Sequence, residues 1–355
     1  SWQPSVTSTL PQMYTPPLDH AEEDLPLVDR NQSKGYYNFN VNDFDFGPKV
    51  WSKIDVTNNE YSHYAKVGLK VSKNLCGATG QTPIDLTHVN RNCKEFHQIR
   101  ARGGKWKNLT KEGEITFHIL PSHLRIQIDS DHPKAPRADS PGGFVELYAD
   151  HVEITTPSLH TMNGVRFDAE YSIYHVQGSL SRILVMSVVI DASQNIHNQQ
   201  FQKVLNAFWR VDNCGIPSVQ SEHVSQPDEN DGNDGSSNRG QNPDKTPKAS
   251  IPSKFNLYNT EMVPSIYWYA YDGSLPRPPC SKIANWRVYD TPMKISYLQL
   301  KQIKYLLESG PCQNKEGGQV HVRPIQPSNG RRVWKCTPED FLSDCERFGT
   351  LCPAP

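Results

Sequence analysis

Short segments in which apolar and polar side chains alternate dominate the chain from Trp51 to about Val219, and two more follow later. They are EITFHIL, HLRIQID, FVELYADHVEI, FDAEYSIYHV, ILVMSVVID, SIYWYAYDGSL and ANWRVYD. Alternation with a period of two is typical of β-strands that bury one face. Two stretches, Ile196 to Phe208 and Leu298 to Leu307, show the apolar spacing of helices instead. Because strands and helices do not alternate regularly, the pattern predicts a β-rich α+β fold rather than a doubly wound sheet.

Three regions lack this periodicity. Residues 1–39 form an arm rich in Pro, Ser and Asp, which is expected either to stay disordered or to wrap a partner. Residues 221–250 contain almost no apolar side chain, so they are predicted to form a disordered polar insertion. Its acidic side chains could bind calcium weakly, but DENDGNDG lacks the spaced glutamate of an EF-hand loop, which favours a solvated loop. A tail, 337–355, carries Cys345 and Cys352.

Charge and cysteine content bear on partners and compartment. Lys and Arg total 37 against 38 Asp and Glu, so no overall field attracts nucleic acid or an anionic membrane. No apolar run is long enough to cross a bilayer. Eight cysteines, with sequons at Asn31 and Asn108, predict a glycosylated, disulfide-bonded protein that is secreted, either extracellular or lumenal. Since the chain starts at Ser1 without a basic and apolar leader, we expect the numbering to begin after a removed signal peptide.

One predicted hairpin, residues 151–176, directs polar side chains to a single face. Its two strands place six residues there: His151, Glu153, Thr155, Glu170, Ser172 and Tyr174. Polar groups that face one shared space are typical of a site for a metal, a substrate or water. Only one of the six is a histidine. The residues alone therefore leave open a lost metal site, a metal site of unusual composition, and no site at all.

Six separated segments resemble, in the same order, those that mark the alpha-class carbonic anhydrases. They are FGPKVW (46–51), GQTPIDL (80–86), TPSLHTMNG (156–164), YDGSLPRPPCS (271–281), NWRVYDTPMKIS (285–296) and VRPIQPSNGRRV (322–333). The resemblance covers residues 40–336. It implies a single domain around a large, twisted, mostly antiparallel sheet, with zinc at the floor of a conical cleft.

The resemblance also implies one disulfide. Secreted members of the family join a cysteine shortly before the GQTPIDL-like segment to one just after the YDGSLPRPP-like segment, and these positions are Cys76 and Cys280 here. In the chain-entropy model, a bridge that closes a loop of about two hundred residues stabilises the fold by about 4–5 kcal/mol. The pairing of the other cysteines stays open, and these are Cys93, Cys214, Cys312, Cys336, Cys345 and Cys352.

The resemblance places the zinc-ligand positions of the family on Glu153, Thr155 and Ser172, with His151 beside them. Catalytic zinc needs three good donors and an open position for a water whose pKa falls to about 7. Hydroxyl groups of serine and threonine are weak ligands unless they are deprotonated. We therefore expect no metal and no other cofactor. We expect His151 and Glu153 to form a hydrogen-bonded polar pair in a solvated cleft instead.

The rest of the implied machinery is altered in the same direction. Pro276 replaces the hydroxyl that would orient a zinc-bound hydroxide, its neighbour is Arg277, and Leu159 replaces the glutamate that would accept the hydroxyl's proton. Proline has neither a hydroxyl nor an N–H, and leucine accepts no hydrogen bond. His123 takes the position of a proton-shuttling histidine, and Tyr174 is expected to narrow the cleft.

Three buried polar residues carry structural expectations. His160 and His175 are expected to be hydrogen-bonded inside the fold rather than catalytic. Glu170 matches a family residue that orients a ligand histidine. Because that histidine is absent here, Glu170 is expected to bond Ser172, or to pair with Arg277 if that side chain turns inward.

Three functional hypotheses follow. The first is a catalytically inactive carbonic-anhydrase-related protein, a pseudoenzyme that acts as a binding or structural module and meets protein partners, or other copies of itself, through the arm and the tail. The second is an active carbonic anhydrase, which hydrates carbon dioxide reversibly with zinc in a rebuilt site of His123, His151 and Glu153. The third is an acidic matrix or mineral-associated protein in which the arm and the insertion act. The missing ligands favour the first.

Overall fold

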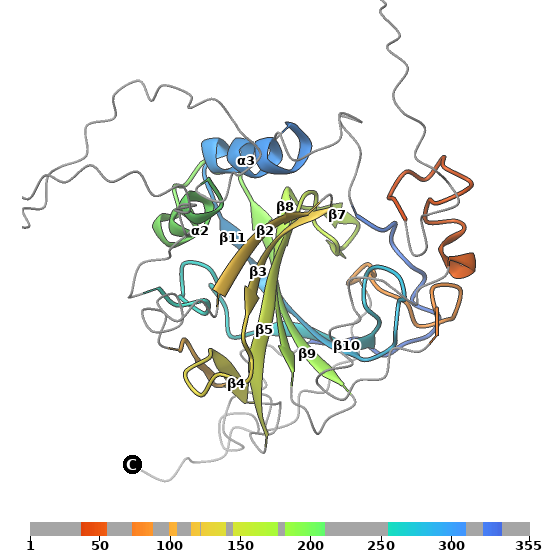
Figure 1. Ribbon diagram of the computed structural model, residues 1–355, viewed down its shortest axis with the longest axis horizontal. Helices are drawn as coiled ribbons and strands as arrows, with labels where there is room; N and C mark the ends of the chain where they lie inside the picture. The colour runs from red at the N-terminus through yellow and green to blue at the C-terminus, as the bar shows by residue number, and fades with distance from the viewer. Residues whose placement is uncertain are drawn as a thin grey trace, which may run out of the picture. The chain divides into compact units, whose positions relative to one another are not determined.

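A computed structural model of the chain describes residues 37–54, 73–87, 99–104, 115–120, 122–139, 145–176, 182–209, 255–309 and 322–335 (Figure 1). Several predicted features lie outside these residues. They include the arm up to residue 36, the insertion, the tail and the two sequon residues Asn31 and Asn108. The six cysteines whose pairing the sequence leaves open also lie outside them.

A large sheet dominates the described residues. Its strands, and the two strands of a small second sheet, are β1 (Ala101–Arg102), β2 (Ile115–Leu120), β3 (His123–Ile128), β4 (Arg137–Asp139), β5 (Glu146–Thr155), β6 (Thr161–Met162), β7 (Val165–Arg166), β8 (Ala169–Val176), β9 (Ile183–Asp191), β10 (Trp268–Gly273), β11 (Ala284–Lys294) and β12 (Trp334–Lys335). The large sheet has ten strands, in the order β1-β4-β5-β8-β9-β11-β10-β12, with β3 also pairing with β5 and β2 with β3. Its pairings are antiparallel except that of β9 with β11. The predicted β-rich, mostly antiparallel fold is confirmed.

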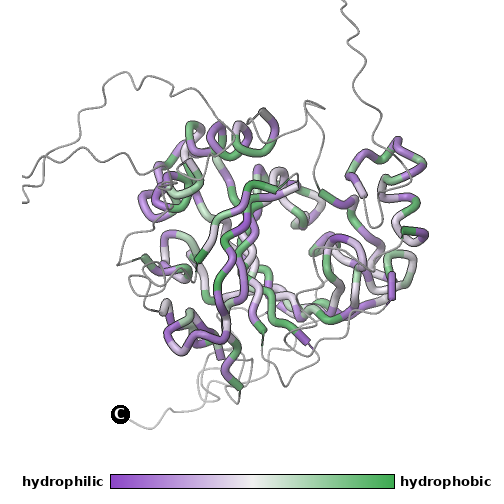
Figure 2. Tube along the Cα trace, viewed as in Figure 1, coloured by the Kyte–Doolittle hydropathy of each residue, from purple (hydrophilic) through white to green (hydrophobic). Residues whose placement is uncertain are grey.

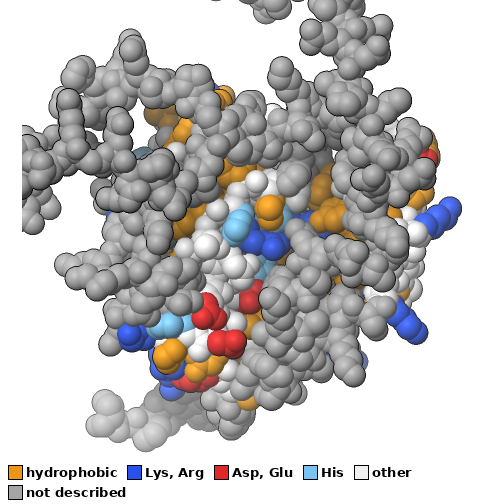
Figure 3. Space-filling view, in the orientation of Figure 1, with side chains coloured by type: hydrophobic (Ala, Val, Ile, Leu, Met, Phe, Trp, Pro, Cys, Tyr) orange, Lys and Arg blue, Asp and Glu red, His pale blue; other side chains and the backbone are white. Residues whose placement is uncertain are grey.

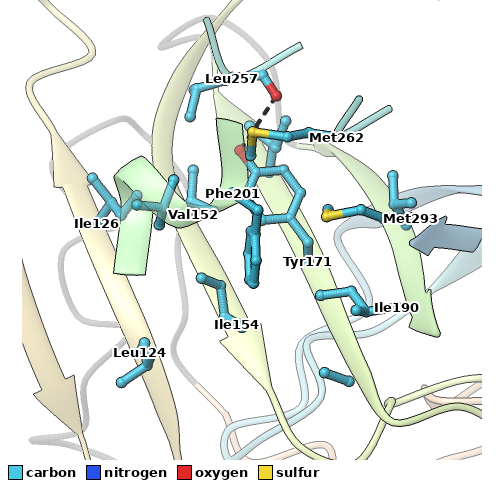
Figure 4. Close-up of a cluster of buried hydrophobic side chains, with 14 of the residues drawn as sticks. Leu124, Ile126, Val152, Ile154, Tyr171, Ile190, Phe201, Leu257, Met262 and Met293 are labelled. Atoms are coloured by element: carbon cyan, nitrogen blue, oxygen red, sulfur yellow. Dashed lines mark hydrogen bonds between the residues drawn. The ribbon is translucent and has the colours of Figure 1, made fainter. Parts of the chain in front are cut away.

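Alternation along the central strands divides the sheet into two faces, and Figure 2 shows the hydropathy changing along them. Val152 and Ile154 of β5 lie on the same face as Tyr171 of β8, and all three belong to the main apolar core. Figure 4 shows these side chains together with those of neighbouring strands and of the helix after β9. The hydroxyl of Tyr171 donates to the carbonyl of Leu257 at 3.3 Å. The alternate residues of the same strands are therefore left to face the opposite side.

Two helices pack on the core and lie next to each other in Figure 1. They are α2 (Gln199–Trp209) and α3 (Tyr297–Lys304), and α3 continues as the π-helical turn η3 (Tyr305–Ser309), while a short 3-10 helix, η1 (Trp51–Lys53), lies near the start of the described chain. Ser296 and Gln299 form a capping box at the start of α3. No helix among the described residues is long and apolar enough to cross a membrane.

Both predicted helices are present, but two residues of their apolar patterns do not face the core. Ile196 is 50% exposed and Leu298 is 68% exposed. Ile196 precedes the first residue of α2, and Leu298 lies in the first turn of α3 on the side away from Leu300 and Ile303, which are buried. The apolar spacing thus predicts both helices correctly. It wrongly predicts that the first apolar residue of each pattern is buried.

The disulfide implied by the resemblance is present. Cys76 and Cys280, which are 204 residues apart in the sequence, are bonded to each other. They pack with Phe39 and Trp51 in a small apolar cluster. This bridge ties the segment before GQTPIDL to the loop that follows β10.

Candidate functional site

Strands β5 and β8 form the polar face that the hairpin sequence predicts. Their antiparallel register gives three opposite pairs, His151–Tyr174, Glu153–Ser172 and Thr155–Glu170. Each of these six residues is at most 1% exposed. The structure therefore brings the six together, but the expectation of a solvated cleft at His151 and Glu153 is wrong. The neighbouring strands and the loop after β10 cover both side chains.

The polar row continues across the neighbouring strands. β3 places Arg125 opposite Glu153, and β9 places Ser187 opposite Ser172. Four polar residues thus lie side by side on four adjacent strands, on the face opposite the apolar core. Figure 3 shows histidine and Lys or Arg side chains together near the middle of the face viewed there.

Glu153 gathers four nitrogen-bearing side chains at one oxygen atom. Its Oε1 accepts a hydrogen bond from Arg277 and, at 2.8 Å, one from Nη2 of Arg125. The Nε2 atoms of His123 and His151 each lie 3.3 Å from the same oxygen. These five residues are called the Glu153 cluster below. Arg277 turns inward, as one hypothesis required, but its partner is Glu153 and not Glu170.

A second carboxylate, that of Asp150, contacts the cluster. Oδ2 of Asp150 lies 2.6 Å from Nδ1 of His151, whose ring stacks on Tyr174 with 4.3 Å between the ring centroids. The two guanidinium groups thus bind the carboxylate of Glu153, and the carboxylate of Asp150 contacts the cluster through His151. Buried ions are tolerated when they are paired and hydrogen-bonded in this way.

The surrounding charges keep Glu153 ionised. Burial raises the pKa of its carboxyl group, but Arg277 above all, with His123 and Arg125, holds that pKa well below its ordinary value. The second oxygen, Oε2, and the hydroxyl of Thr155 are buried and make no hydrogen bond within the described part of the chain. The interactions of this carboxylate are thus concentrated on Oε1.

The disulfide holds the loop that carries Arg277. The backbone N–H of Cys280 donates to the carbonyl of Arg277 at 2.8 Å, and that of Leu75 donates to the carbonyl of Pro279 at 2.8 Å. Because Cys280 is bonded to Cys76, this loop is attached to the segment around Leu75 both covalently and by hydrogen bonds. A long side chain that would otherwise prefer solvent is therefore directed into the interior.

The two residues that replace the hydroxyl and the glutamate of the family, Pro276 and Leu159, are buried as well. Pro276 is buried in the loop after β10. Leu159 is 2% exposed and belongs to an apolar cluster with Tyr174 and Trp286. Neither side chain has a group that could orient a hydroxide.

Glu170 belongs to a separate network. Its Oε2 accepts from the backbone N–H of His160 at 2.8 Å, and its Oε1 lies 2.8 Å from Nδ1 of His160 and accepts from the hydroxyl of Ser187 at 2.5 Å. The hydroxyl groups of Ser187 and Ser172 are 2.8 Å apart. The expectation that Glu170 bonds Ser172 or Arg277 is therefore wrong, because Ser187 on β9 reaches both Glu170 and Ser172.

The two histidines expected to be structural are buried and hydrogen-bonded. Nε2 of His160 lies 2.6 Å from the hydroxyl of Tyr271. His175 lies between the carbonyl of Leu184, at 3.1 Å, and the hydroxyl of Tyr258, at 2.8 Å. Burial lowers the pKa of His175 to about 4, so this ring is neutral at physiological pH.

The donors at the three ligand positions do not fit zinc. Oε1 of Glu153 already accepts hydrogen bonds from two guanidinium groups, so a dication at this oxygen would lie beside two positive charges. Thr155 and Ser172 offer neutral hydroxyl groups, which bind zinc weakly. Within the described ranges, no group of three or more His, Cys, Asp or Glu side chains is arranged to hold a metal.

Three residues of this site were not predicted from the sequence: Arg125, Asp150 and Ser187. Two of them carried a signal, because Ser187 is the one hydroxyl residue in the apolar segment ILVMSVVI, and Arg125 lies between two buried residues of HLRIQID. Neither could be assigned without the register that aligns β3 and β9 with the hairpin. Asp150 reaches the site through the side chain of His151.

Comparisons with known proteins agree with this architecture. The family of eukaryotic-type carbonic anhydrases matches the chain over residues 236–337. Alpha carbonic anhydrase 4 of Arabidopsis thaliana is 26% identical to this chain over 290 residues, which is 81% of each protein. Putative carbonic anhydrase 5 of Caenorhabditis elegans is 37% identical over 86 residues, and this match spans 23% of the chain and 26% of that protein.

Two solved structures share the fold. The crystal structure of dioscorin complexed with ascorbate aligns with 84% of this chain and 97% of its own, with a TM-score of 0.55 and 17% identity. The alpha-carbonic anhydrase from Thermovibrio ammonificans, complexed with sulfanilamide, aligns with 85% of this chain and 100% of its own, with a TM-score of 0.51 and 18% identity. The chain is therefore similar in sequence to carbonic anhydrases and has the alpha-carbonic-anhydrase fold.

Proposed function

We propose that this chain is a non-catalytic, secreted member of the carbonic-anhydrase-like family, in which a buried ion cluster takes the place of the catalytic metal. One observation carries the proposal. The carboxylate of Glu153, which stands at a ligand position of the family, accepts hydrogen bonds from Arg277 and Arg125. A guanidinium group cannot lower the pKa of a bound water as zinc does, because it offers no open coordination position.

The residues around the cluster support the same proposal. His123, at the proton-shuttle position, lies 2.9 Å from the hydroxyl of Ser122 through Nδ1 and 3.3 Å from Glu153 through Nε2. It therefore belongs to the ion cluster rather than to a path for protons. Pro276 and Leu159 lack the hydroxyl and the carboxylate that would orient an attacking hydroxide.

The test is a metal analysis of the purified chain together with a carbon dioxide hydration assay. An active alpha-carbonic anhydrase, purified and assayed in parallel, serves as the positive control. We expect less than one zinc per chain by a wide margin, and a hydration rate equal to that of buffer. One tightly held zinc per chain, with hydration that a sulfonamide abolishes, would contradict the proposal.

A rebuilt metal site is the second candidate, because one observation favours it. The Nε2 atoms of His123 and His151 both approach Oε1 of Glu153, so two imidazoles and a carboxylate converge. Such a site would require Arg277 to leave the carboxylate. Zinc content measured for His151→Ala beside the unchanged chain distinguishes the candidates, since zinc bound by this triad would be lost with the imidazole.

The assembly role is the second part of the proposal. The Cys76–Cys280 disulfide supports an oxidising compartment, as the two sequons do in the sequence. The arm and the tail lie outside the residues that resemble the family. An arm that has no apolar core of its own becomes ordered when it binds along another protein chain. Removal of residues 1–35 should lower the mass of the protein in solution or its retention in its native matrix. Unchanged values of both would contradict a role of the arm in assembly.

The third hypothesis, an acidic matrix or mineral-associated protein, depends on the polar insertion. Deletion of residues 221–250 tests it, because the ion cluster and the disulfide lie outside the deleted segment. If the insertion acts, association with the matrix falls while the fold stays intact by circular dichroism. If the deletion changes neither, the insertion is a solvated loop.

A further inference from the structure

A pocket of about 400 Å³ shares no lining residue with the Glu153 cluster. Its apolar walls come from three separated segments, with Phe39 and Val41 in the first, Pro157 in the second and Pro324 in the third. In Figure 1 the first segment is the red chain near residue 40, and the third is the dark blue chain that follows residue 321. This volume, lined mainly by apolar groups, is typical of sites for small ligands or single side chains.

Two arginines also line this pocket, and neither has a carboxylate partner among the described residues. Arg323 is 3% exposed and donates to neutral oxygens only: the side chain of Gln81 at 2.8 Å and the carbonyls of Thr82 and Cys76 at 3.1 and 2.9 Å. Burial lowers the pKa of Arg323 to about 10, still well above physiological pH. Its charge therefore lies in the pocket wall without a counter-ion among the residues that the structure describes.

Arg166 supplies the second positive charge and has an unused hydrogen-bonding edge. Its Nη1 donates to the carbonyls of Ser158 and Leu159. Within the part of the chain that the structure describes, Nε and Nη2 donate to no group, and Arg166 forms no ion pair. The buried charge of Glu170 acts on Arg166 from a distance, but the oxygens of Glu170 are already bound to His160 and Ser187.

We propose that this pocket binds a carboxylate carried on a small apolar group, with Arg166 as the residue that holds the carboxylate. The unused Nε and Nη2 edge of a guanidinium matches the two oxygens of a carboxylate and binds them through two parallel hydrogen bonds. Arg323 adds positive potential without needing a direct contact. The apolar walls at Phe39, Pro157 and Pro324 receive the rest of the ligand.

Benzoate titrated into the full chain is the first probe, and neutral benzamide, which has the same ring, is its control. Binding followed by saturation-transfer NMR should detect benzoate and not benzamide. In Arg166→Gln, the affinity for benzoate should fall at least about tenfold, the cost of losing a charge-assisted hydrogen bond. Arg182→Gln is the matched control, because Arg182 is equally a surface arginine but pairs with Asp272 outside the pocket, and it should leave the affinity unchanged.

A second variant separates ligand binding from folding. Val41→Asp leaves Arg166 in place but adds a negative charge to the pocket wall, and it should weaken benzoate binding by a similar factor. Val41 is 43% exposed, so this change leaves the core intact. A capped Leu-Glu-Leu peptide, with Leu-Gln-Leu as its control, tests whether the carboxylate comes from a protein side chain instead. The proposal is supported if the chain binds benzoate or Leu-Glu-Leu more tightly than the neutral control, and if Arg166→Gln and Val41→Asp both lose this binding. Binding of neither acid, or equal binding in Arg166→Gln, overturns it.

Discussion

Glu153 and Glu170 lie on adjacent strands and are both at most 1% exposed, yet the protein stabilises their charges in different ways. Burial raises the pKa of each carboxyl group, and in each case the surroundings reverse this effect. At Glu153 the reversal comes mainly from the charge of Arg277. At Glu170 it comes from His160, through its charge and its hydrogen bonds, and from the hydroxyl of Ser187. The first carboxylate is held by ion pairs and the second by a hydrogen-bonded network without arginine.

The two carboxylates also differ in how many of their oxygens are hydrogen-bonded. Both oxygens of Glu170 accept hydrogen bonds, and Ser187 links Glu170 to Ser172 without any need for a histidine there. Glu153 instead concentrates its interactions on Oε1. A buried negative charge at this position requires a positive charge beside it, and Arg277 supplies that charge.

The largest effect is expected from changing Glu153, Thr155 and Ser172 together to histidine. Three imidazoles on the same face of the adjacent strands β5 and β8 would point to one space, and structural zinc in zinc-finger peptides binds with apparent free energies of about 10–16 kcal/mol. With Arg277 in place, however, an unpaired guanidinium would occupy that space. We expect about one zinc per chain, by metal analysis after dialysis, only when Arg277→Thr is added to the three changes.

The matched control for this experiment carries Arg277→Thr with alanine at the three positions, and it should bind no zinc. Carbon dioxide hydration should stay slow in the zinc-binding variant, because Pro276 and Leu159 still cannot orient a hydroxide. Equal zinc binding with and without Arg277 would mean that the guanidinium does not block the metal position. The ion pair of Arg277 with Glu153 would then not explain why this position should hold no metal.

The next effect in size is expected for Glu153→Gln, which removes the charge but keeps the shape. Arg125 and Arg277 would lose their shared carboxylate, and loss of one partner of a buried ion pair costs about 3–5 kcal/mol. Urea unfolding measures this cost. Glu146→Gln is the control, since Glu146 pairs with Arg102 and Arg137 at the surface, where such pairs contribute less than about 1 kcal/mol. Similar losses for the two variants would contradict a charge-dependent cluster.

A smaller loss is expected for Glu170→Gln. The amide keeps one oxygen as an acceptor, but its NH₂ group replaces the other oxygen and faces a donor from His160 or Ser187. An unsatisfied buried donor costs about 1–3 kcal/mol. The same unfolding experiment should therefore rank Glu170→Gln between Glu153→Gln and the surface control. If Glu170→Gln is the more damaging of the two buried changes, hydrogen bonds outweigh ion pairs at this site.

Much of the fold could be predicted from the sequence because the central strands are long enough to show their period. β5, β8 and β9 each contain eight or more residues, and their alternation fixed both the strands and the polar face. β1, β6, β7 and β12 have two residues each, which is too short for any period to be visible. The parallel pairing of β9 with β11 also had no local signal, because the two strands are separated by nearly a hundred residues.

The composition of the site was predictable, but its interactions were not. Resemblance and alternation together placed Glu153, Ser172 and Arg277 near one another. The sequence did not show whether Arg277 would form an ion pair with Glu153 or with Glu170. That choice depends on the register of β3, which brings Arg125 beside Glu153, and on the loop that the disulfide holds. The burial of His151 and Glu153 was predicted wrongly for the same reason. A polar face of a sheet is expected to contact solvent unless the side chains that cover it are known.

The last prediction concerns the pH dependence of stability, which separates three buried groups. A group whose pKa is lower in the folded protein stabilises the fold above its ordinary pKa, and this contribution is lost as the pH falls toward the folded value. His175, whose pKa falls from 6.5 to about 4, should reduce the free energy of unfolding between about pH 6.5 and 4. Glu153 and Glu170 start from an ordinary value of 4.5, so their contributions should be lost only below about pH 4.5.

Glu153→Gln should therefore change the slope of the unfolding free energy against pH in the acidic range alone. Each group that binds a proton only on unfolding adds about 1.4 kcal/mol per pH unit to the slope. Below about pH 4.5 the slope of the variant should be shallower than that of the unchanged chain by up to this amount. Between pH 5 and 6.5, where His175 contributes to the slope and the carboxyl group of Glu153 does not, the two slopes should agree. A difference that begins near pH 6 would show that Glu153 is linked to the protonation of a histidine of its cluster, and that the ion pairs with arginine do not by themselves hold its charge.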